Sequence, residues 1–389
     1  MTVEPVVERV PAERLTSGDF FADVDDQDLV YFLLNVGDAD CQLILMPAEV
    51  DAAGETDRRA IVVDVGRTGK LPPLIEDLRA SPKDRVMLRR TPGPGTFPIV
   101  VGTHPHDDHL RGMPEFFERY GQEIGEYWDP GYYFTGPGYV DTMAALEDAG
   151  QWIQYAQPTS GLARFVGLVK LTVLSPGIGL RNRFDSYGIT PNNASISLRV
   201  EFPSSRVEQR DEERRYLKIR RPQALILGAD AQTLSWAQVV LDFPELRAQD
   251  SPVANYLKMA SGSYPLNATV FKVAHHGSKH GVNLELLELI DPDISLVSSV
   301  SSGGKYNFPH RVAIEAIREG LQATTSGQRR EPDWDLRRGL HYTSGVDSNG
   351  VNLGSIAIVL SPSGRKRHIW RFGDGSSQTV DLGNGRQFT

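Results

Sequence analysis

A short histidine-rich segment constrains this chain more than any other feature. Residues 103–109 read Thr-His-Pro-His-Asp-Asp-His and follow an apolar run, residues 98–102, that predicts a buried strand. The potential metal ligands in this segment are His104, His106, Asp108 and His109. They cannot all share one face of a regular element, so they predict a loop wrapped around bound ions. Imidazole and carboxylate suit zinc, iron and manganese, and this spacing can send two ligands to each of two neighbouring ions.

Composition limits the class of protein. With 389 residues, 40% hydrophobic and 23% charged, the chain has room for one large globular domain or two ordinary ones. The formal net charge of −9 argues against affinity that comes mainly from general attraction to phosphates, although a local basic groove stays open. The single cysteine, Cys41, excludes an intrachain disulfide and a cysteine-rich zinc site. Because the start of the chain lacks the order of a signal peptide and no run approaches the ~18 apolar residues of a membrane span, we expect a cytoplasmic protein.

Strand-like and helix-like segments follow one another in two halves. Strands first and then helices, repeated twice, predict two sheets packed face to face with helices outside. We expect strands at residues 29–36, 41–46, 60–65, 98–102, 125–130, 169–174, 194–202, 223–227, 268–274, 294–300 and 355–360, and helices at 70–80, 110–120, 139–155, 232–241, 284–290 and 311–320.

The main domain is predicted to span residues 28–365, between an N-terminal tail (1–27) and a C-terminal extension (366–389). Two charged insertions interrupt it, at about residues 204–221 and 324–339. Each is interpreted as a solvated surface segment, or alternatively as a nucleic-acid contact, the second because arginines surround Trp334.

Two further apolar strands end in metal-ligand residues. Asp230 follows residues 224–229, and the pair His275 and His276 follows residues 270–274. Ligands at strand ends that open on one edge of a sandwich can converge, which would supply a bridging carboxylate from Asp230 and a last imidazole from His275 or His276.

Together these motifs resemble the metallo-β-lactamase fold, and more narrowly its branch in the hydrolase domain of the DNA-uptake channel protein ComEC. The resemblance covers about residues 29–365. Its motifs are Asn35-Val36-Gly37-Asp38-Ala39-Asp40, Val63-Asp64-Val65-Gly66, Thr103 to His109, Leu174-Ser175-Pro176, Asn192-Asn193-Ala194-Ser195, Leu227-Gly228-Ala229-Asp230, Lys272-Val273-Ala274-His275-His276-Gly277-Ser278, Tyr342-Thr343 and Gly354-Ser355-Ile356-Ala357.

The resemblance implies an α/β fold, an αββα sandwich of two mixed sheets, that holds two divalent ions, Zn²⁺ or Mn²⁺. One ion would take His104 and His106, the other Asp108 and His109 with His275 or His276, and Asp230 would lie between them. No histidine lies between His109 and His275, so the imidazole that usually completes the first site is missing. Asn193, Ser175 or water are the candidates for its place, and we expect the first ion to be held more loosely.

The same resemblance implies roles for residues around the ions. Asp108 would orient a metal-bound hydroxide while ligating, and His310, Lys279 and His280 are candidates for phosphate contact or leaving-group protonation. Asn193 and Ser278 are further substrate-binding candidates, and Asp40 and Asp64 would brace the histidine loop. Exposed polar, turn or capping residues are the alternative interpretation of each. Phe308 stands where the branch usually has a histidine, in Asn307-Phe308-Pro309-His310.

Three functions remain open at this point. The first is a metal-dependent phosphodiesterase, most simply a nuclease acting on DNA or another phosphodiester. The second is a hydrolase of a small ester, lactone, thioester or β-lactam, which the acidic net charge favours and the missing histidine disfavours. The third is a non-catalytic or partner-dependent subunit, with a protein partner or a homo-oligomer left open.

Overall fold

The computed structural model describes residues 9–50, 56–81, 87–183, 190–203, 223–242, 266–300, 307–322 and 339–388. The charged insertion at 204–221 lies outside these residues, as does nearly all of the insertion at 324–339. Among the described helices, none combines the length and the apolar character needed to cross a membrane.

The larger sheet has ten strands in the order β10-β9-β8-β7-β4-β3-β19-β20-β21-β2. The pairs from β7 to β10 are parallel and the others are antiparallel, so the sheet is mixed. Its strands are β2 (Leu15–Ser17), β3 (Leu29–Leu33), β4 (Cys41–Leu45), β7 (Ala60–Val65), β8 (Phe97–Val101), β9 (Ile124–Trp128), β10 (Gln154–Ala156), β19 (Ile356–Leu360), β20 (Arg367–Arg371) and β21 (Arg386–Phe388).

The smaller sheet has seven strands in the order β11 to β17. It is antiparallel from β11 to β14 and parallel from β14 to β17. Its strands are β11 (Ala163–Val166), β12 (Val169–Ser175), β13 (Ser197–Phe202), β14 (Gln223–Leu227), β15 (Val270–Lys272), β16 (Ile294–Val297) and β17 (Leu340–Tyr342). Two short ribbons add β1 (Arg9–Val10) with β18 (Val346–Asp347), and β5 (Glu49–Val50) with β6 (Thr56–Asp57).

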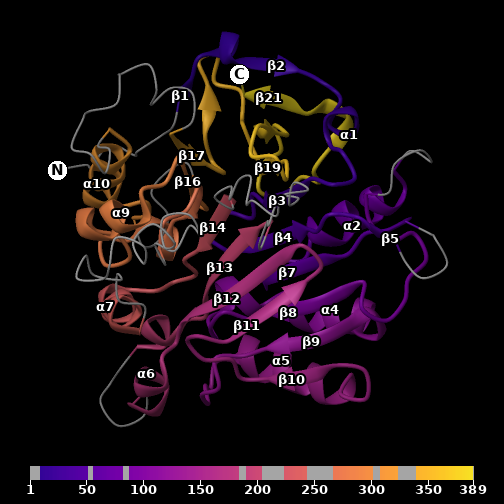
Figure 1. Cartoon of the computed structure of the whole chain (residues 1–389), viewed down its shortest axis with the longest axis vertical. Coiled ribbons are helices and arrows are strands. Elements are labelled where there is room, and N and C mark those ends of the chain that lie inside the picture. Colours follow the sequence, from indigo (N-terminus) through magenta and orange to yellow (C-terminus); the bar gives the residue numbers. More distant parts are fainter. Residues whose placement is uncertain are drawn as a thin grey trace, which may run out of the picture.

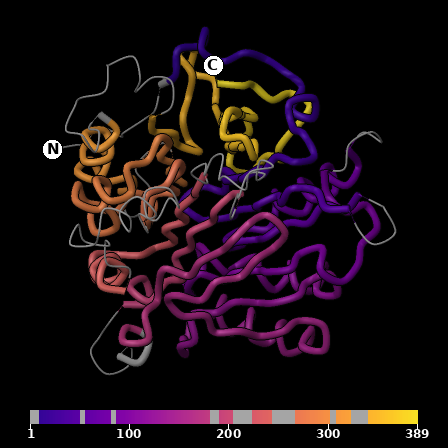
Figure 2. The backbone as a smooth tube through the Cα atoms, viewed as in Figure 1, coloured from indigo at the N-terminus to yellow at the C-terminus, as the bar shows by residue number. Residues whose placement is uncertain are grey.

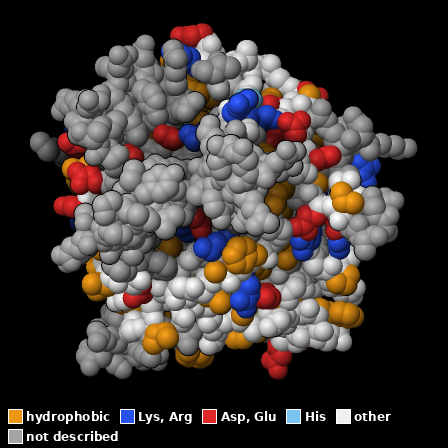
Figure 3. Space-filling model, viewed as in Figure 1, with side chains coloured by type: hydrophobic (Ala, Val, Ile, Leu, Met, Phe, Trp, Pro, Cys, Tyr) orange, Lys and Arg blue, Asp and Glu red, His pale blue; other side chains and the backbone are white. Residues whose placement is uncertain are grey.

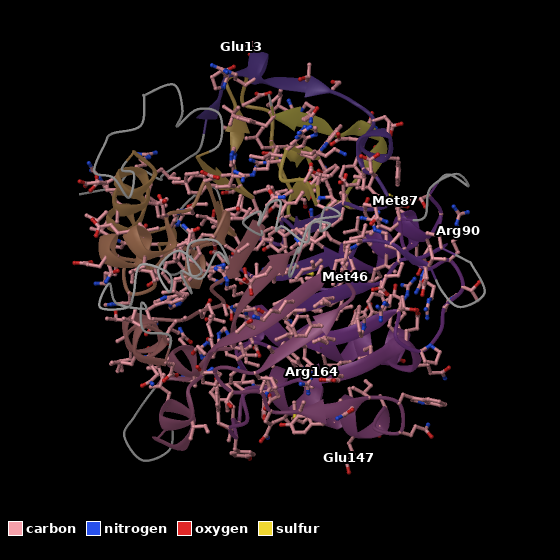
Figure 4. All side chains as sticks on the ribbon, viewed as in Figure 1. Glu13, Met46, Met87, Arg90, Glu147 and Arg164 are labelled. Atoms are coloured by element: carbon pink, nitrogen blue, oxygen red, sulfur yellow. The ribbon has the colours of Figure 1, made fainter. Side chains whose placement is uncertain are left out.

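Apolar side chains from both sheets form the central core. Tyr31 and Val63 of the larger sheet belong to the same buried cluster as Leu198 and Leu225 of the smaller one. Met46, labelled in Figure 4, is another of its buried side chains. Successive strand residues point to opposite faces, so the neighbours of these residues face outward, where helices cover them.

Helices cover the outer face of each sheet and complete the sandwich. The helices α2 (Leu71–Arg79), α4 (Met113–Tyr120) and α5 (Pro137–Asp148) pack on the larger sheet, and α7 (Thr233–Asp242), α9 (Leu284–Ile290) and α10 (Arg311–Gln322) pack on the smaller one. Figure 1 shows these two groups on opposite sides of the molecule. The expected αββα sandwich of two mixed sheets is therefore confirmed.

Short helices complete the list of elements. They are α1 (Phe20–Asp23), α3 (Asp107–Leu110), α6 (Ile178–Arg183), η1 (Ala12–Arg14), η2 (Gly121–Glu123), η3 (Pro191–Ala194), η4 (Ala274–Gly277) and η5 (Leu382–Asn384). The helix expected at residues 139–155 was wrong at its end, because α5 stops at Asp148 and Gln154 already begins β10. Ala149 and Gly150 form the turn between the two elements, with Gly150 N donating to Glu147 O.

Both ends of the described chain enter the larger sheet. β2, from the expected N-terminal tail, pairs with β21, and β20 pairs with β19 next to β3. Figure 2 shows the yellow C-terminal strands against the indigo N-terminal ones. The segments expected as tail and extension thus share hydrogen bonds with the main domain.

A buried ion pair connects the two sheets. Asp40 immediately precedes β4 in the larger sheet, and Lys272 ends β15 in the smaller one; both are fully buried and their side chains form a salt bridge. Burial raises the pKa of Asp40, but Lys272 and two nearby histidines lower it more, so the net pKa lies below its usual value. Asp40 is therefore charged at neutral pH, and Lys272 is the cation nearest to it among the described residues.

We predict that Lys272→Met destabilises the fold by about 3–5 kcal/mol, because it removes one partner of a buried ion pair and leaves Asp40 without its salt bridge. The measurement is urea unfolding of the metal-free protein. Lys170→Met is the control: Lys170, on β12, forms a surface pair with Glu201 at 3.3 Å, and such pairs contribute only about 0–1 kcal/mol. Equal stability of the two variants would contradict the prediction.

Candidate metal centre

Four strands deliver side chains to one edge of the sandwich. Asp64 lies within β7, and the histidine loop, including α3, follows β8. Asp230 follows β14, and η4 with its two histidines follows β15. Since β7 is parallel to β8 and β14 is parallel to β15, each pair ends at one edge. Backbone hydrogen bonds join the loops, from Ile196 N to Thr103 O (2.8 Å) and from His275 N to Ala229 O (2.8 Å).

Two groups of potential ligands share the carboxylate of Asp230. One group consists of His104, His106 and Asp230, and the other of Asp108, His109, Asp230 and His276. Within each group the ligand atoms lie within 4.8 Å of one another. The structure thus brings together the ligands expected from the histidine loop, the Asp230 strand end and one histidine of the pair.

The separations between these atoms are those of ligands around an ion. Two atoms each about 2.1 Å from a tetrahedral ion lie about 3.4 Å apart, whereas a charge-assisted hydrogen bond is about 2.7–2.9 Å long. His109 Nε2 lies 3.3 Å from Asp230 Oδ1, His276 Nε2 3.6 Å from Asp108 Oδ2, and His104 Nε2 3.6 Å from Asp230 Oδ2. These distances are too long for strong direct hydrogen bonds and match a shared ion.

Three atoms at the centre of the second group lack a hydrogen-bond partner among the described residues. They are His109 Nε2, Asp230 Oδ1 and His276 Nε2, all buried. Unpaired buried polar atoms are costly, and three of them within one group of closely spaced ligand atoms indicate a cation-binding site. The donor set of two imidazoles and two carboxylates therefore fits a divalent ion.

Hydrogen bonds behind the second group hold its imidazoles in place. Asp64 Oδ2 lies 2.7 Å from His109 Nδ1 and accepts from Thr103 Oγ1 at 2.8 Å. His276 Nδ1 lies 3.0 Å from Ser298 Oγ, which donates to Asp40 Oδ1 at 2.5 Å. Each ring therefore presents Nε2 to the centre, the arrangement in which a second layer of residues orients metal ligands. Asp40 and Asp64 occupy the bracing positions expected from the sequence.

The two groups differ in their electrostatics. Burial lowers the pKa of His109 and of His276, but the carboxylates of Asp64, Asp108, Asp230 and Asp40 raise it more, so both pKa values end above the usual one. For His104 and His106 burial prevails and the pKa is lowered. Burial raises the pKa of Asp230, yet the neighbouring imidazoles lower it well below its usual value. Without an ion, the imidazoles of the second group therefore keep their protons to a higher pH than those of the first.

Backbone strain collects around this centre. The described non-glycine residues with positive φ are Asp64, Ala229, His275, His276, Asp291 and Asn307, and all but Asp291, which ends α9, lie in the segments just described or next to Phe308. Such conformations cost roughly 1–3 kcal/mol each and persist where the surrounding structure requires them. Their concentration here supports a functional site.

The remaining expected site residues lie at different depths. Lys279 and His280 are exposed after η4. Ser278 is buried and its Oγ accepts from His280 N at 3.3 Å. His310 accepts at Nδ1 from Val312 N (3.3 Å), which places it at the start of α10. Asn193 directs its amide to Thr190 and Gln232 and is not hydrogen-bonded to His104 or His106 among the described contacts.

Several neighbours of the centre were not anticipated from the sequence. Ser298 and Lys272 lie behind His276 and Asp40, while Asn192 and Gln232, rather than Asn193, contact the His275 ring. Two phenylalanines flank the rings, Phe134 at 5.7 Å from His106 and Phe308 at 5.0 Å from His275 between ring centroids. A lysine inside an apolar strand run, Val-Phe-Lys-Val, was the one available signal for Lys272.

Metal binding at the two groups should depend differently on pH. Because the pKa values of His109 and His276 are raised, an ion must displace their protons, and its affinity rises with pH by about tenfold per unit for each proton released. His104 and His106 have lowered pKa values and are already neutral at pH 7. We therefore expect the zinc affinity of His106→Asn, which retains the second group, to rise steeply between pH 6 and pH 8. The zinc affinity of His276→Asn, which retains the first group, should change little over the same range. Parallel profiles would contradict this.

Gly66 permits the close approach of the histidine loop to β7. A Cβ at Gly66 would lie 2.0 Å from the carbonyl oxygen of Asp108. We predict that Gly66→Ala displaces Asp108 and weakens zinc binding at the second group by at least about tenfold. Gly69→Ala is the control, since its Cβ would meet no atom within 4 Å, and zinc binding should not change. Unchanged affinity in Gly66→Ala would refute the role of this contact.

Comparisons with known proteins leave the family of this chain open. No protein-family model matches the chain, and no curated protein is similar to it in sequence. Similar solved structures include the diiron β-hydroxylase CmlA from Streptomyces venezuelae (11% identity, TM-score 0.38, covering 82% of this chain and 53% of that one) and a long-form RNase Z from yeast (11%, 0.36, 82% and 41%). The metallo-β-lactamase-fold protein YhfI from Bacillus subtilis is similar at 10% identity and a TM-score of 0.34, covering 80% of this chain and 96% of that one.

The chain spans about half the length of CmlA. The ComEC-like branch indicated by the motifs is not confirmed by these similarities and stays a prediction. The chain has two mixed sheets packed as a sandwich, with a centre suited to divalent ions at one edge.

Proposed function

We propose that the protein is a metal-dependent hydrolase with a two-ion centre, and that its substrates are phosphodiesters, most simply DNA. The observation that carries the proposal is one buried carboxylate, Asp230, shared by two ligand groups whose unpaired atoms are spaced as ligands of an ion. Paired ions a few ångströms apart supply a nucleophilic water of lowered pKa and stabilise charge on phosphoryl oxygens, which suits phosphodiester cleavage.

In this proposal, the ligand sets follow the two groups. His104 and His106 hold one ion, Asp108, His109 and His276 hold the other, and Asp230 bridges them. Asp108 is the most exposed member of the second group, with 37% of its side chain accessible against at most 1% for His109, Asp230 and His276. The substrate therefore reaches the centre past Asp108, and this carboxylate can accept a hydrogen bond from the attacking water and orient it.

Residues at the open side are assigned to the phosphate and the leaving group. Because His310 Nδ1 accepts from Val312 N, its neutral ring carries the proton on Nε2 and can donate it to a leaving oxygen. His310 N also donates to Gly277 O at 2.8 Å, which holds this residue beside η4. Lys279 and His280 are exposed just beyond the same turn and can contact phosphate oxygens.

The charge distribution of the protein gives little general attraction for a polyanionic substrate, so substrate binding depends on the metal centre. On the face in Figure 3, basic and acidic side chains of the described residues are interspersed rather than gathered by sign. With a net charge of −9, general attraction to a polyanion is weak, so the ions and the few cations beside them must supply it. We therefore expect short or single-stranded substrates to be cleaved as readily as long duplexes.

A second candidate, hydrolysis of a small ester or lactone, is favoured by one observation. The Phe308 ring lies 5.0 Å from the His275 ring and 6.1 Å from the His276 ring, at the position where the ComEC-like branch usually has a histidine. An apolar side chain at this place suits an uncharged acyl group better than a phosphate.

We predict that the protein with Mn²⁺ or Zn²⁺ cleaves single-stranded DNA, double-stranded DNA or a bis-aryl phosphodiester, and that Asp108→Ala and His109→Ala each lower the rate by about 10³-fold or more. The measurement is initial rate against each substrate, with metal content determined in parallel. Glu115→Ala changes an exposed acid on α4 and should keep the wild-type rate. A metal-loaded protein that cleaves none of these substrates, while hydrolysing an aryl ester or lactone, would favour the second candidate.

A further inference from the structure

The two oxygens of Asp230 face different pairs of imidazoles. Oδ1 lies 3.3 Å from His109 Nε2 and 4.0 Å from His276 Nε2. Oδ2 lies 3.6 Å from His104 Nε2 and 3.4 Å from His275 Nε2. The 3.4 Å separation for His275 is that of two ligand atoms of one tetrahedral ion, about 3.4 Å. His275 therefore stands toward Oδ2 as His276 and His109 stand toward Oδ1.

The backbone of η4 separates the two neighbouring histidines. His275 and His276 have φ values of 52° and 51°, and their ring centroids lie 6.4 Å apart. Two successive non-glycine residues in the left-handed region cost about 1–3 kcal/mol each. This conformation places one ring on each oxygen of Asp230, a result that a regular helix or strand at this place would not give.

The surroundings of His275 suit a ligand more than a surface residue. Its side chain is 16% exposed, and the Phe308 ring packs against it. The side-chain amide of Gln232 lies 3.1 Å from His275 Nδ1. Exchanging the oxygen and nitrogen of that amide makes Oε1 the acceptor of an Nδ1 proton, which leaves Nε2 unprotonated. Nε2 then faces Asp230 Oδ2 and the Asn192 side-chain amide, each at 3.4 Å.

We propose that His275 supplies the third imidazole of the His104/His106 site, so that the pair His275-His276 gives one ligand to each ion. This rests on the two-ion centre of the proposed function. His275 lies outside the group of three ligand atoms that lie within 4.8 Å of one another, so ligation requires its ring to move closer to that group. The first site then has three nitrogens and a carboxylate oxygen, and the expectation from the sequence that its ion is the looser one no longer applies.

The test is zinc binding to the metal-free protein, followed by competition with a chromophoric chelator. His275→Asn is the informative variant, because asparagine tolerates a positive φ and removes the imidazole. We expect it to retain one tightly bound ion and to weaken the other by at least about 100-fold. The double variant His106→Asn/His275→Asn should keep that same tightly bound ion. The double variant His276→Asn/His275→Asn should bind both ions more weakly. His368→Asn, in β20 beside Asp23, is the control and should bind two ions as the wild type does.

Two results would overturn the assignment. One is wild-type affinity for both ions in His275→Asn, and the other is loss of both tight ions in the His106→Asn/His275→Asn double variant, which would place His275 in the second site. Far-UV circular dichroism and unfolding midpoints of the metal-free variants exclude misfolding as the cause. Because no substrate is used, a protein with this binding pattern and no phosphodiesterase activity would refute the proposed function alone.

Discussion

The structure depends on one buried carboxylate, Asp40, which links the two sheets to both ligand loops. Its side chain pairs with Lys272 and accepts from Ser298, which in turn contacts His276. Its backbone N donates to Asp108 O at 3.0 Å, and its backbone O accepts from Gly66 N at 2.8 Å. The position of each sheet edge is therefore transmitted through this residue to the ions' ligands, and the apolar core between the sheets sets the geometry of the centre.

Much of the fold and the grouping of the candidate ligands could be predicted from the sequence. Strands such as β4 and β7 are buried on both faces, so they appear as continuous apolar runs that are recognised without structural information. The ligand loop is local, with His104 to His109 in consecutive positions, and Asp230 directly follows a strand. Residue type and strand-end position were sufficient to predict that these side chains lie together, because both are properties of short segments.

Properties that depend on tertiary contacts could not be predicted. Whether His275 or His276 faces the second group follows from two left-handed φ values and from Ser298, a residue 22 positions away from His276. Asn192 rather than Asn193 contacts His275 because η3 orients the two amides differently. Likewise, residues 149–156 leave α5 and enter the sheet as β10 because β9 offers them an edge to pair with.

In the proposed two-ion centre, the shared position of Asp230 would make the two sites thermodynamically dependent on each other. An ion bound to one oxygen changes the charge and the position of the other oxygen, so filling one site alters the affinity of its neighbour. By reciprocity, the second ion alters the affinity for the first by the same factor. The centre would therefore respond to the availability of metal cooperatively, either favouring the doubly loaded protein or leaving a population with a single ion.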